Sequence, residues 1–286
     1  MLKEKIQPPV PIKIGIVLYD GFDSLDVAGP NQIFYFLGLF DRAHGGVELY
    51  HIGPEAGALV TSLEGLKWEA GTDYQKMKDV ALDVIFVPGG AGAGYEEILE
   101  YQKNNGAHPP RGASKKFRHL LENKEDVFKH FYHFLRTQVQ NADEAYQKRQ
   151  RQSPLLVTSV CTGALLLARA GLLEGFTCTT HWAYKNILSL FPGVNVAPGF
   201  PRYVIDRNRI SGGGISSGID EALAIVEILR GPEMARQIQL AIQYAPNPPF
   251  SSGDPSVASA STLYTVSENF DTGELYQVMK KKLARS

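Results

Sequence analysis

Short apolar runs rich in β-branched residues recur along the chain, with helix-forming runs between them. The stretches "IKIGIVLY" (12–19), "ALDVIFVPGG" (81–90) and "LLVTSV" (155–160) lack the polar alternation that a half-exposed strand would show. Continuous apolar runs of this length are typical of strands buried on both faces. Because such strands alternate with helices, the sequence predicts an α/β fold in which helices cover both faces of a mostly parallel central sheet.

Charge and hydropathy argue against a nucleic-acid-binding, membrane-spanning or secreted protein. The 286 residues include 29 Lys and Arg against 30 Asp and Glu, a net charge of −1. Such a balance gives no overall attraction to nucleic acid or to an anionic membrane. No apolar run approaches the roughly 20 residues that span a bilayer, and the N-terminus lacks the apolar core of a secretory signal. We therefore expect a cytoplasmic protein with neither nucleic acid nor membrane as a partner.

We expect a single domain over residues 12–255, with an N-terminal arm before it (1–11) and a C-terminal arm and helix after it (256–286). Residues 101–153 interrupt the alternation, and we interpret them as a helical insertion before the cysteine strand. This segment carries 11 Lys and Arg against 5 Asp and Glu. Its apolar residues recur at helical spacing and predict an amphipathic helix with a solvated basic face: Phe128, Phe131, Leu135 and Val139. A basic face that binds a partner is the alternative.

Several local signals mark turns and helix ends. Alternating runs around a turn predict hairpins within 58–74 and 202–214. Pro30 is suited to the first turn of a helix, as is Pro232 further along. A last helix is expected over about 262–284.

Cys161 lies at the junction between the strand 155–160 and a Leu- and Ala-rich helix. The N-terminus of a helix favours a thiolate, which is the reactive form of cysteine, and a sharp strand-to-helix turn can present a nucleophile. The alternative is a small apolar residue in the core, since cysteines are often buried. Cys178, within an apolar run, is interpreted as structural. Two cysteines do not form a disulfide framework.

Other candidate residues admit two interpretations each. Asp26 in "SLDVAGP" can exchange a proton with a substrate beside a thiolate, or it can cap the following helix. His181 in "TTHWAY" can orient or deprotonate the cysteine, or it can cap and pack a helix start. Gly89 and Gly90 in "PGGAGAG" allow close approach of backbone amides to a reacting group. No cluster has the residues and spacing of a metal site.

Four segments together resemble the ThiJ/PfpI superfamily, which has the class I glutamine amidotransferase-like fold: "IGIVLYDGFDSLDVAGP", "DVIFVPGG", "SVCTGALLLARAGLLEGFTCTTHWAY" and "ISGGGISSGIDEALAIVEIL". The resemblance covers about 12–100 and 154–255. It implies a flavodoxin-like three-layer sandwich with a nucleophile elbow, a homodimer and no cofactor. Within the superfamily, the aspartate of "LDVAGP" and the tail "QLAIQYAPNPPFSSGDPSVA" are similar to the isonitrile hydratase (isocyanide hydratase) branch.

That resemblance implies an enzyme whose substrate is a small isonitrile. Cys161 is then the nucleophile, Asp26 the acid and base, and Thr162 the neighbour of the cysteine at the elbow. Attack by sulfur and protonation by the carboxyl give a thioimidate, which water converts to an N-substituted formamide. Gly89, Gly90 and His181 are candidates for binding the substrate or its developing charge. The segment 101–153 is longer than the family pattern, which leaves substrate size open.

Two other functions remain open from the sequence. One is a superfamily enzyme that acts on aldehydes or carbonyl adducts, in the manner of glyoxalases and deglycases; many such relatives carry a glutamate where this chain has Asp26. The other is a sensory domain without catalysis, because similar segments occur in AraC-type transcription regulators. Only about 30 residues follow the "PPFSSGDP" arm, and a helix-turn-helix module needs more.

Overall fold

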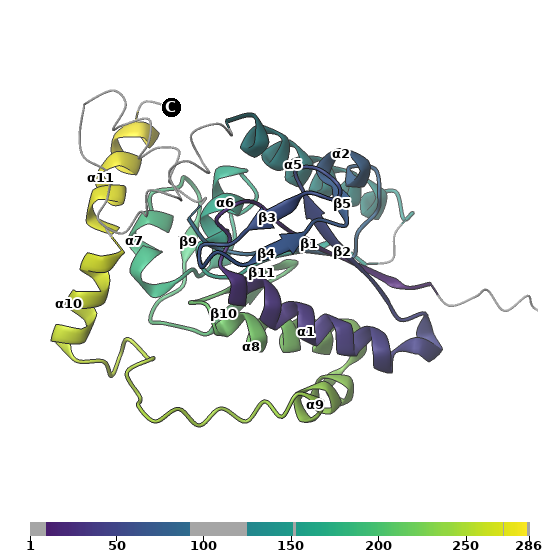
Figure 1. Cartoon of the computed structure of the whole chain (residues 1–286). Coiled ribbons are helices and arrows are strands. Elements are labelled where there is room, and N and C mark those ends of the chain that lie inside the picture. Colours follow the sequence, from purple (N-terminus) through teal and green to yellow (C-terminus); the bar gives the residue numbers. More distant parts are fainter. Residues whose placement is uncertain (1–9, 92–124, 151–152, 271, 285–286) are drawn as a thin grey trace, which may run out of the picture.

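A seven-stranded sheet forms the centre of the molecule. The computed structural model describes residues 10–91, 125–150, 153–270 and 272–284 (Figure 1). The sheet has the strand order β10-β11-β7-β6-β1-β2-β5, and all neighbours are parallel except β10 and β11. The strands are β1 (Ile12–Val17), β2 (Val47–Gly53), β5 (Thr72–Asp73), β6 (Val84–Val87), β7 (Leu156–Ser159), β10 (Tyr203–Asp206) and β11 (Arg209–Gly212). Two small ribbons stand apart, β3 (Leu59–Thr61) with β4 (Lys67–Glu69) and β8 (Thr177–Cys178) with β9 (Asn195–Val196).

Helices cover both faces of the sheet, which completes the predicted three-layer α/β sandwich. In Figure 1, α1, α8 and α9 lie below the sheet, and α2, α5 and α6 lie above it. The helices are α1 (Ser24–Phe40), α2 (Tyr74–Met77), α5 (Glu125–Gln147), α6 (Gly163–Arg169), α7 (Lys185–Leu188), α8 (Ser217–Arg230), α9 (Pro232–Ala241), α10 (Ala260–Asn269) and α11 (Thr272–Leu283), with 3₁₀ turns η1 (Arg42–His44) and η2 (Trp182–Tyr184). No described helix combines the length and apolar character needed to cross a membrane.

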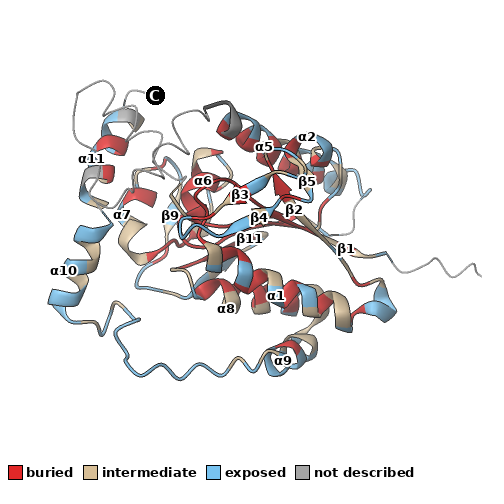
Figure 2. Cartoon of the chain, viewed as in Figure 1, coloured by how far each residue is buried: buried red, intermediate tan, exposed pale blue. Residues whose placement is uncertain are grey.

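Burial explains why the central strands are continuously apolar. Every residue of β6 and β7 is buried, and β1 is buried except at Lys13. The inner faces of the helices share this core (Figure 2). Because both faces of these strands are covered, polar alternation would place unpaired polar groups in the core. Both predicted hairpins are present, as β3–β4 and as β10–β11.

Helix α5 lies on one face of the sheet and contributes its apolar side to the hydrophobic core. Parallel neighbours need a crossover connection, and α5 lies in the connection between β6 and β7. The four apolar residues that predicted an amphipathic helix are all buried, and the ring of Phe131 packs edge-on to Tyr19 with centroids 5.8 Å apart. Of the expected helical insertion 101–153, the structure describes α5 as the helix before the cysteine strand, and residues 101–124 and 151–152 lie outside the described residues.

Two expected helix boundaries were wrong. Helix α1 begins at Ser24, because the side chain of Asp23 caps it by accepting a hydrogen bond from the N–H of Leu25. Pro30 is therefore inside the helix rather than in its first turn. The expected helix 262–284 is two helices, α10 and α11, and α10 ends where the Phe270 ring packs against His181 with centroids 5.2 Å apart.

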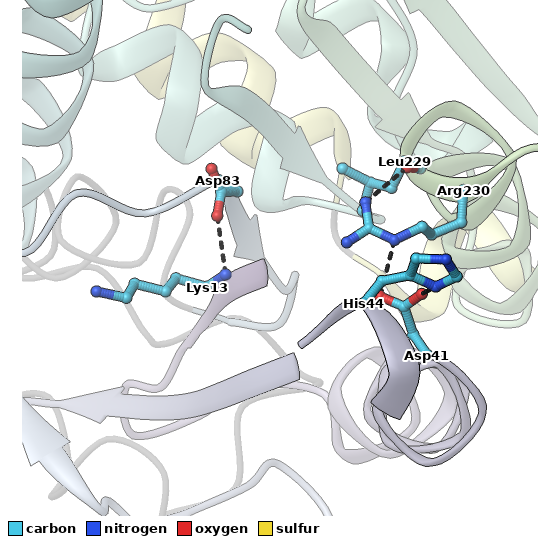
Figure 3. Close-up of polar contacts among 6 residues, drawn as sticks. All are labelled: Lys13, Asp41, His44, Asp83, Leu229 and Arg230. Carbon is cyan, nitrogen blue, oxygen red and sulfur yellow. Dashed lines mark hydrogen bonds and ion pairs between the residues drawn. The ribbon is translucent and has the colours of Figure 1, made fainter. Parts of the chain in front are cut away.

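Buried charge pairing ties the ends of α1 and α8 together (Figure 3). The carboxylate of Asp41, which is fully buried, accepts a hydrogen bond from Nε of Arg230 at 2.7 Å and contacts Nδ1 of His44 at 3.0 Å. On the sheet, the carboxylate of Asp83 accepts a hydrogen bond from the N–H of Lys13 at 2.9 Å.

The chain changes direction across the sheet between β1 and β6. From β1 it continues outward through β2 to β5, and from β6 it continues the other way through β7 to β11. Open α/β sheets bind ligands at such a switch point, outside the carboxyl ends of the strands. The loops that follow β1, β6, β7 and β11 meet there.

Candidate active site

Cys161 occupies a strained turn between β7 and α6. Its φ is +56°, a left-handed conformation that non-glycine residues rarely adopt. Two hydrogen bonds hold the turn: the N–H of Cys161 donates to the carbonyl of Gly213 at 2.8 Å, and its carbonyl accepts from Oγ1 of Thr180 at 2.7 Å. Strain of this kind persists only where surrounding contacts enforce it, and it is concentrated at functional sites.

Asp26 lies in the first turn of α1, and its side chain extends toward the turn at Cys161. Its side chain is fully buried, and its Oδ2 accepts a hydrogen bond from the N–H of Gly89 at 2.8 Å. Oδ1 has no hydrogen-bond partner among the described residues. Burial raises the pKa of this carboxyl well above its usual value, the nearby Asp23 raises it further, and the Gly89 N–H lowers it. Asp26 can therefore hold a proton in a pH range where an exposed aspartate cannot.

The turn after β6 brings the cysteine and the carboxyl together at Gly89. A Cβ built on Gly89 would lie 2.6 Å from the N of Thr162, 2.7 Å from Cβ of Cys161 and 2.9 Å from Oδ2 of Asp26. No side chain fits in that space, because real Cβ contacts are longer. Gly89 is therefore the point at which three separate segments converge.

Thr162 connects the cysteine turn to the glycine turn. Its Oγ1 accepts a hydrogen bond from the N–H of Gly90 and donates to the carbonyl of Gly90, both at 2.8 Å. Gly90 has φ +136° and forms an antiparallel bridge with Phe22, in the loop before α1. Five of the six residues singled out from the sequence thus lie in one constellation: Cys161, Asp26, Thr162, Gly89 and Gly90.

Burial and hydrogen bonding act in opposite directions on the ionisation of the Cys161 sulfur. Cys161 is only 7% exposed. Burial raises the pKa of its thiol well above the usual value, and the charges of Asp26 and Asp23 raise it further. The backbone N–H groups of Thr162 and Ile215 act in the opposite direction by favouring the thiolate. The ionised sulfur expected from the sequence stays a prediction, and Asp26, whose carboxyl is hydrogen-bonded to Cys161, is the neighbouring group that can exchange a proton with it.

His181 packs against Gly214, in the loop that follows β11. Its Nδ1 accepts a hydrogen bond from the N–H of Ala183 at 3.3 Å, so the ring caps η2. A Cβ on Gly214 would lie 2.6 Å from Cδ2 of this ring. Burial lowers the pKa of His181 to about 4, so the imidazole is neutral at physiological pH. The capping alternative describes this geometry, and a contact of His181 with a substrate stays a prediction.

Sequence reasoning missed three contributors to the site. Tyr19 is fully buried and donates a hydrogen bond to the carbonyl of Pro88 at 2.9 Å. The charges of Asp26 and Cys161 add to the effect of burial in raising the pKa of its hydroxyl. Asp23 both caps α1 and acts on the two reacting groups. The N–H of Ile215 faces the sulfur. Only Asp23 had a visible signal, an aspartate just before a helix.

The His, Cys, Asp and Glu side chains of the described residues do not form a metal centre. No group of three or more His, Cys, Asp or Glu side chains there is arranged to hold a metal ion. The chemistry available at the site is that of a thiol, a carboxyl group and backbone amides.

Comparison with known proteins relates this geometry to a family. A family model described as DJ-1/PfpI matches residues 137–228. Isonitrile hydratase of Pseudomonas putida is 34% identical over 252 residues, covering 88% of this chain and 87% of that protein. The HTH-type transcriptional regulator GbdR of Pseudomonas aeruginosa is 38% identical over 85 residues, which are 29% of this chain and 22% of the regulator.

Solved structures show the same fold. A ThiJ/PfpI family protein from Pseudomonas syringae superposes with a TM-score of 0.69 at 23% identity, covering 99% of both chains. Drosophila melanogaster DJ-1beta superposes with a TM-score of 0.59 at 17% identity, covering 83% of this chain and all of that one. At these identities the likeness concerns the fold alone.

Proposed function

The chain belongs to the DJ-1/PfpI family, and we propose that within this family it is a lyase of the isonitrile hydratase type. It adds water to an isonitrile and releases an N-substituted formamide. The identity of 34% with an isonitrile hydratase, over most of both chains, supports this choice of reaction. The observation that carries the proposal is the convergence of Cys161 and Asp26 on Gly89, where a single built Cβ atom would meet both, together with the hydrogen bond between the two side chains.

The first step joins sulfur to the isonitrile carbon. That terminal carbon must gain both a nucleophile and a proton. Asp26, as a carboxylate, accepts the thiol proton of Cys161, and the sulfur attacks the carbon. Asp26 then delivers the same proton to that carbon, giving a thioimidate, R–N=CH–S–Cys161. All atoms of the isonitrile and of the thiol are retained, so no other reactant is consumed.

The second step releases the product with one water molecule. Asp26, again a carboxylate, takes a proton from water while the oxygen bonds to the thioimidate carbon. Asp26 passes that proton to the nitrogen. As the carbon–sulfur bond breaks and the C=O bond forms, the second proton of the water moves from the added hydroxyl through Asp26 to the sulfur of Cys161. The product is R–NH–CHO. Splitting the hydration into two steps with lower barriers is the advantage of covalent catalysis.

The surroundings of the sulfur suit this sequence of events. A thiol with a raised pKa is a weak nucleophile until its proton is removed, and Asp26 is the carboxyl group beside it. The N–H groups of Thr162 and Ile215 favour negative charge on the sulfur once it forms. The elbow, the two amides and the carboxyl therefore have complementary roles.

An assay with a simple alkyl isonitrile tests the proposal. Purified protein is incubated with cyclohexyl isonitrile, and N-cyclohexylformamide is measured by liquid chromatography with mass detection. We expect turnover by the natural chain and loss of turnover in Cys161→Ala. Methylglyoxal is assayed in parallel to measure the aldehyde activity of other family members. A natural chain that consumes methylglyoxal but leaves a panel of isonitriles unchanged would overturn the proposal.

A further inference from the structure

The C-terminal helices are attached to the body of the molecule beside α7. Residues 245–259, which lead to them, form an extended arm in which no residue is buried, and the hydrogen bonds described for this arm are all local. Helix α10 has no buried residue either (Figure 2). Helix α11 packs on α7 and buries Leu275, Val278 and Met279. The placement of this helix pair therefore depends on contacts near α7 and η2, and not on the arm.

Phe270, which directly follows α10, contacts two rings of the body. Its ring centroid lies 5.2 Å from that of His181 at an interplanar angle of 83°, and 6.1 Å from that of Tyr184 at an angle of 48°. Edge-on contacts of this kind are favourable between aromatic rings. Because His181 is buried, the ring of Phe270 contributes to the cover that shields it from water.

His181 packs between the two loops that hold Cys161. The loop after β8 contains Thr180, whose Oγ1 donates a hydrogen bond to the carbonyl of Cys161 at 2.7 Å. The loop after β11 contains Gly213, whose carbonyl accepts a hydrogen bond from the N–H of Cys161 at 2.8 Å. His181 directly follows Thr180 in the chain, and its ring packs on Gly214 in the second loop. A Cβ built on Gly214 would lie 2.6 Å from Cδ2 and 3.1 Å from Nε2 of that ring.

The turn at Cys161 depends on these two loops. Its φ of +56° is unfavourable for a residue with a side chain, and such a conformation persists only where neighbouring contacts enforce it. The hydrogen bonds described for the backbone of Cys161 reach one loop from its carbonyl and the other from its N–H. A change in the spacing of the loops would let the turn relax and would move the sulfur relative to Asp26.

We propose that Phe270 is a positioning residue of the active site, which acts through His181 to keep the two loops at the spacing that the Cys161 turn requires. The C-terminal helices then influence the nucleophile without touching it. Removal of the Phe270 ring would leave His181 less tightly packed and the two loops free to shift. The consequence for catalysis rests on the proposed function; the positioning of the turn does not.

Amide hydrogen exchange of the full chain tests the positioning without any substrate, because it reports the opening of individual hydrogen bonds. The N–H of Cys161 is compared with that of Val157, which donates to the carbonyl of Asn208 at 3.0 Å at the other end of β7. In Phe270→Ala we expect exchange at Cys161 to be faster by up to about tenfold, the effect of losing one well-packed aromatic contact. Exchange at Val157 should stay at the natural rate.

Three further variants complete the exchange experiment. Tyr264→Ala removes an exposed ring from α10 and should change neither rate. Phe270→Tyr keeps the ring and should keep the natural rate at Cys161. Phe270→Leu keeps an apolar side chain without the ring and provides the same comparison if Phe270→Ala does not fold. Unchanged exchange at Cys161, or equal acceleration at Cys161 and Val157, would overturn the proposal, since the latter is the response to a general loss of stability.

Steady-state kinetics tests the consequence for catalysis. A displaced nucleophile slows the chemical step, so Phe270→Ala should lower kcat for isonitrile hydration by about tenfold or more with little change in KM, and Phe270→Tyr should retain the natural kcat. A raised KM at unchanged kcat would refute the positioning role in catalysis, because it would show that Phe270 contributes only to binding. If the natural chain does not hydrate isonitriles, the proposed function fails while the exchange result stands by itself.

Discussion

Oδ2 of Asp26 accepts a hydrogen bond of 2.8 Å from the N–H of Gly89, a residue 63 positions away in the chain. This bond holds the carboxyl beside the turn at Gly89, which Cys161 and Thr162 also contact closely. The position of the carboxyl, and not the ionisation of an isolated thiol, is what makes the site reactive in our account. The predictions below follow from that arrangement and from the contacts that support it.

Asp26→Asn should lower isonitrile hydration by about 10²- to 10⁴-fold, the usual contribution of a general acid and base. Asparagine can still accept the hydrogen bond from Gly89, so the turn is preserved while proton transfer is lost. Steady-state formamide production measures the effect, and near-natural thermal unfolding of the variant confirms that the fold persists. Activity within a few-fold of the natural chain would mean that another group moves the proton.

Gly89→Ala should lower activity by about 100-fold, because a displacement of about 1 Å at a reacting group has that effect. The added Cβ would meet Thr162, Cys161 and Asp26 at less than 3.0 Å, so at least one of them must move. Gly253→Ala is the matched control, since that glycine is exposed and a Cβ there meets nothing within 4 Å. Equal activities of the two variants would contradict the convergence of the site on Gly89.

His181→Gln should be less destabilising at low pH than at neutral pH. The pKa of His181 is about 4 in the folded protein, against about 6.5 in an unfolded chain. Between these values the unfolded chain binds a proton that the folded protein does not, so the stability contributed by neutral His181 is lost as the pH falls. The cost of the substitution should be about 2 kcal/mol smaller at pH 5 than at pH 7.5.

Urea unfolding at the two pH values measures this difference. His133→Gln, which removes an exposed histidine of α5, corrects for the general effect of losing one histidine. A cost for His181→Gln that does not depend on pH would show that burial does not keep the ring neutral.

Arg230→Met should lower the free energy of unfolding by about 3 kcal/mol, because it leaves the fully buried carboxylate of Asp41 without its guanidinium partner. His44 still contacts Asp41, but its own side chain is largely exposed and replaces the lost contact poorly. Lys148→Met is the control: its pair with Glu144 is exposed, and no measurable change is expected. Similar effects of the two substitutions would show that the Arg230–Asp41 pair does not hold α1 and α8 together.

The parts of the fold predicted correctly are those determined by local patterns. Continuous apolar runs identified β1, β6 and β7, and the turn residues identified both hairpins. The junction of a strand and a helix also marked the position of Cys161. By contrast, the boundary of α1 was misplaced because Pro30 was given more weight than the Asp23 cap, although both signals were present. A helix or strand boundary is predicted well from local sequence when a single capping or turn residue marks it, and poorly when two such residues compete.

The parts that were missed depend on contacts between distant segments. The spacing of apolar residues predicted the buried face of α5, but nothing local shows that Phe131 packs against Tyr19. The place of Cys161 before a helix does not show the opposing effects on its pKa, which burial and the charge of Asp26 raise and the N–H groups of Thr162 and Ile215 lower. The complete burial of Glu221 on α8 was not predicted for the same reason, because an acidic residue in an amphipathic helix is normally assigned to the exposed face.

Detection of a covalent adduct on Cys161 tests the account most directly. The natural chain is mixed with cyclohexyl isonitrile, quenched in acid within one turnover, and the digested peptides are analysed by mass spectrometry. We predict that the peptide containing Cys161 gains the mass of one isonitrile, that the gain decays as formamide accumulates, and that Cys178 is unmodified. Formamide produced at an undiminished rate by Cys161→Ala, with no adduct in the natural chain, would contradict the account.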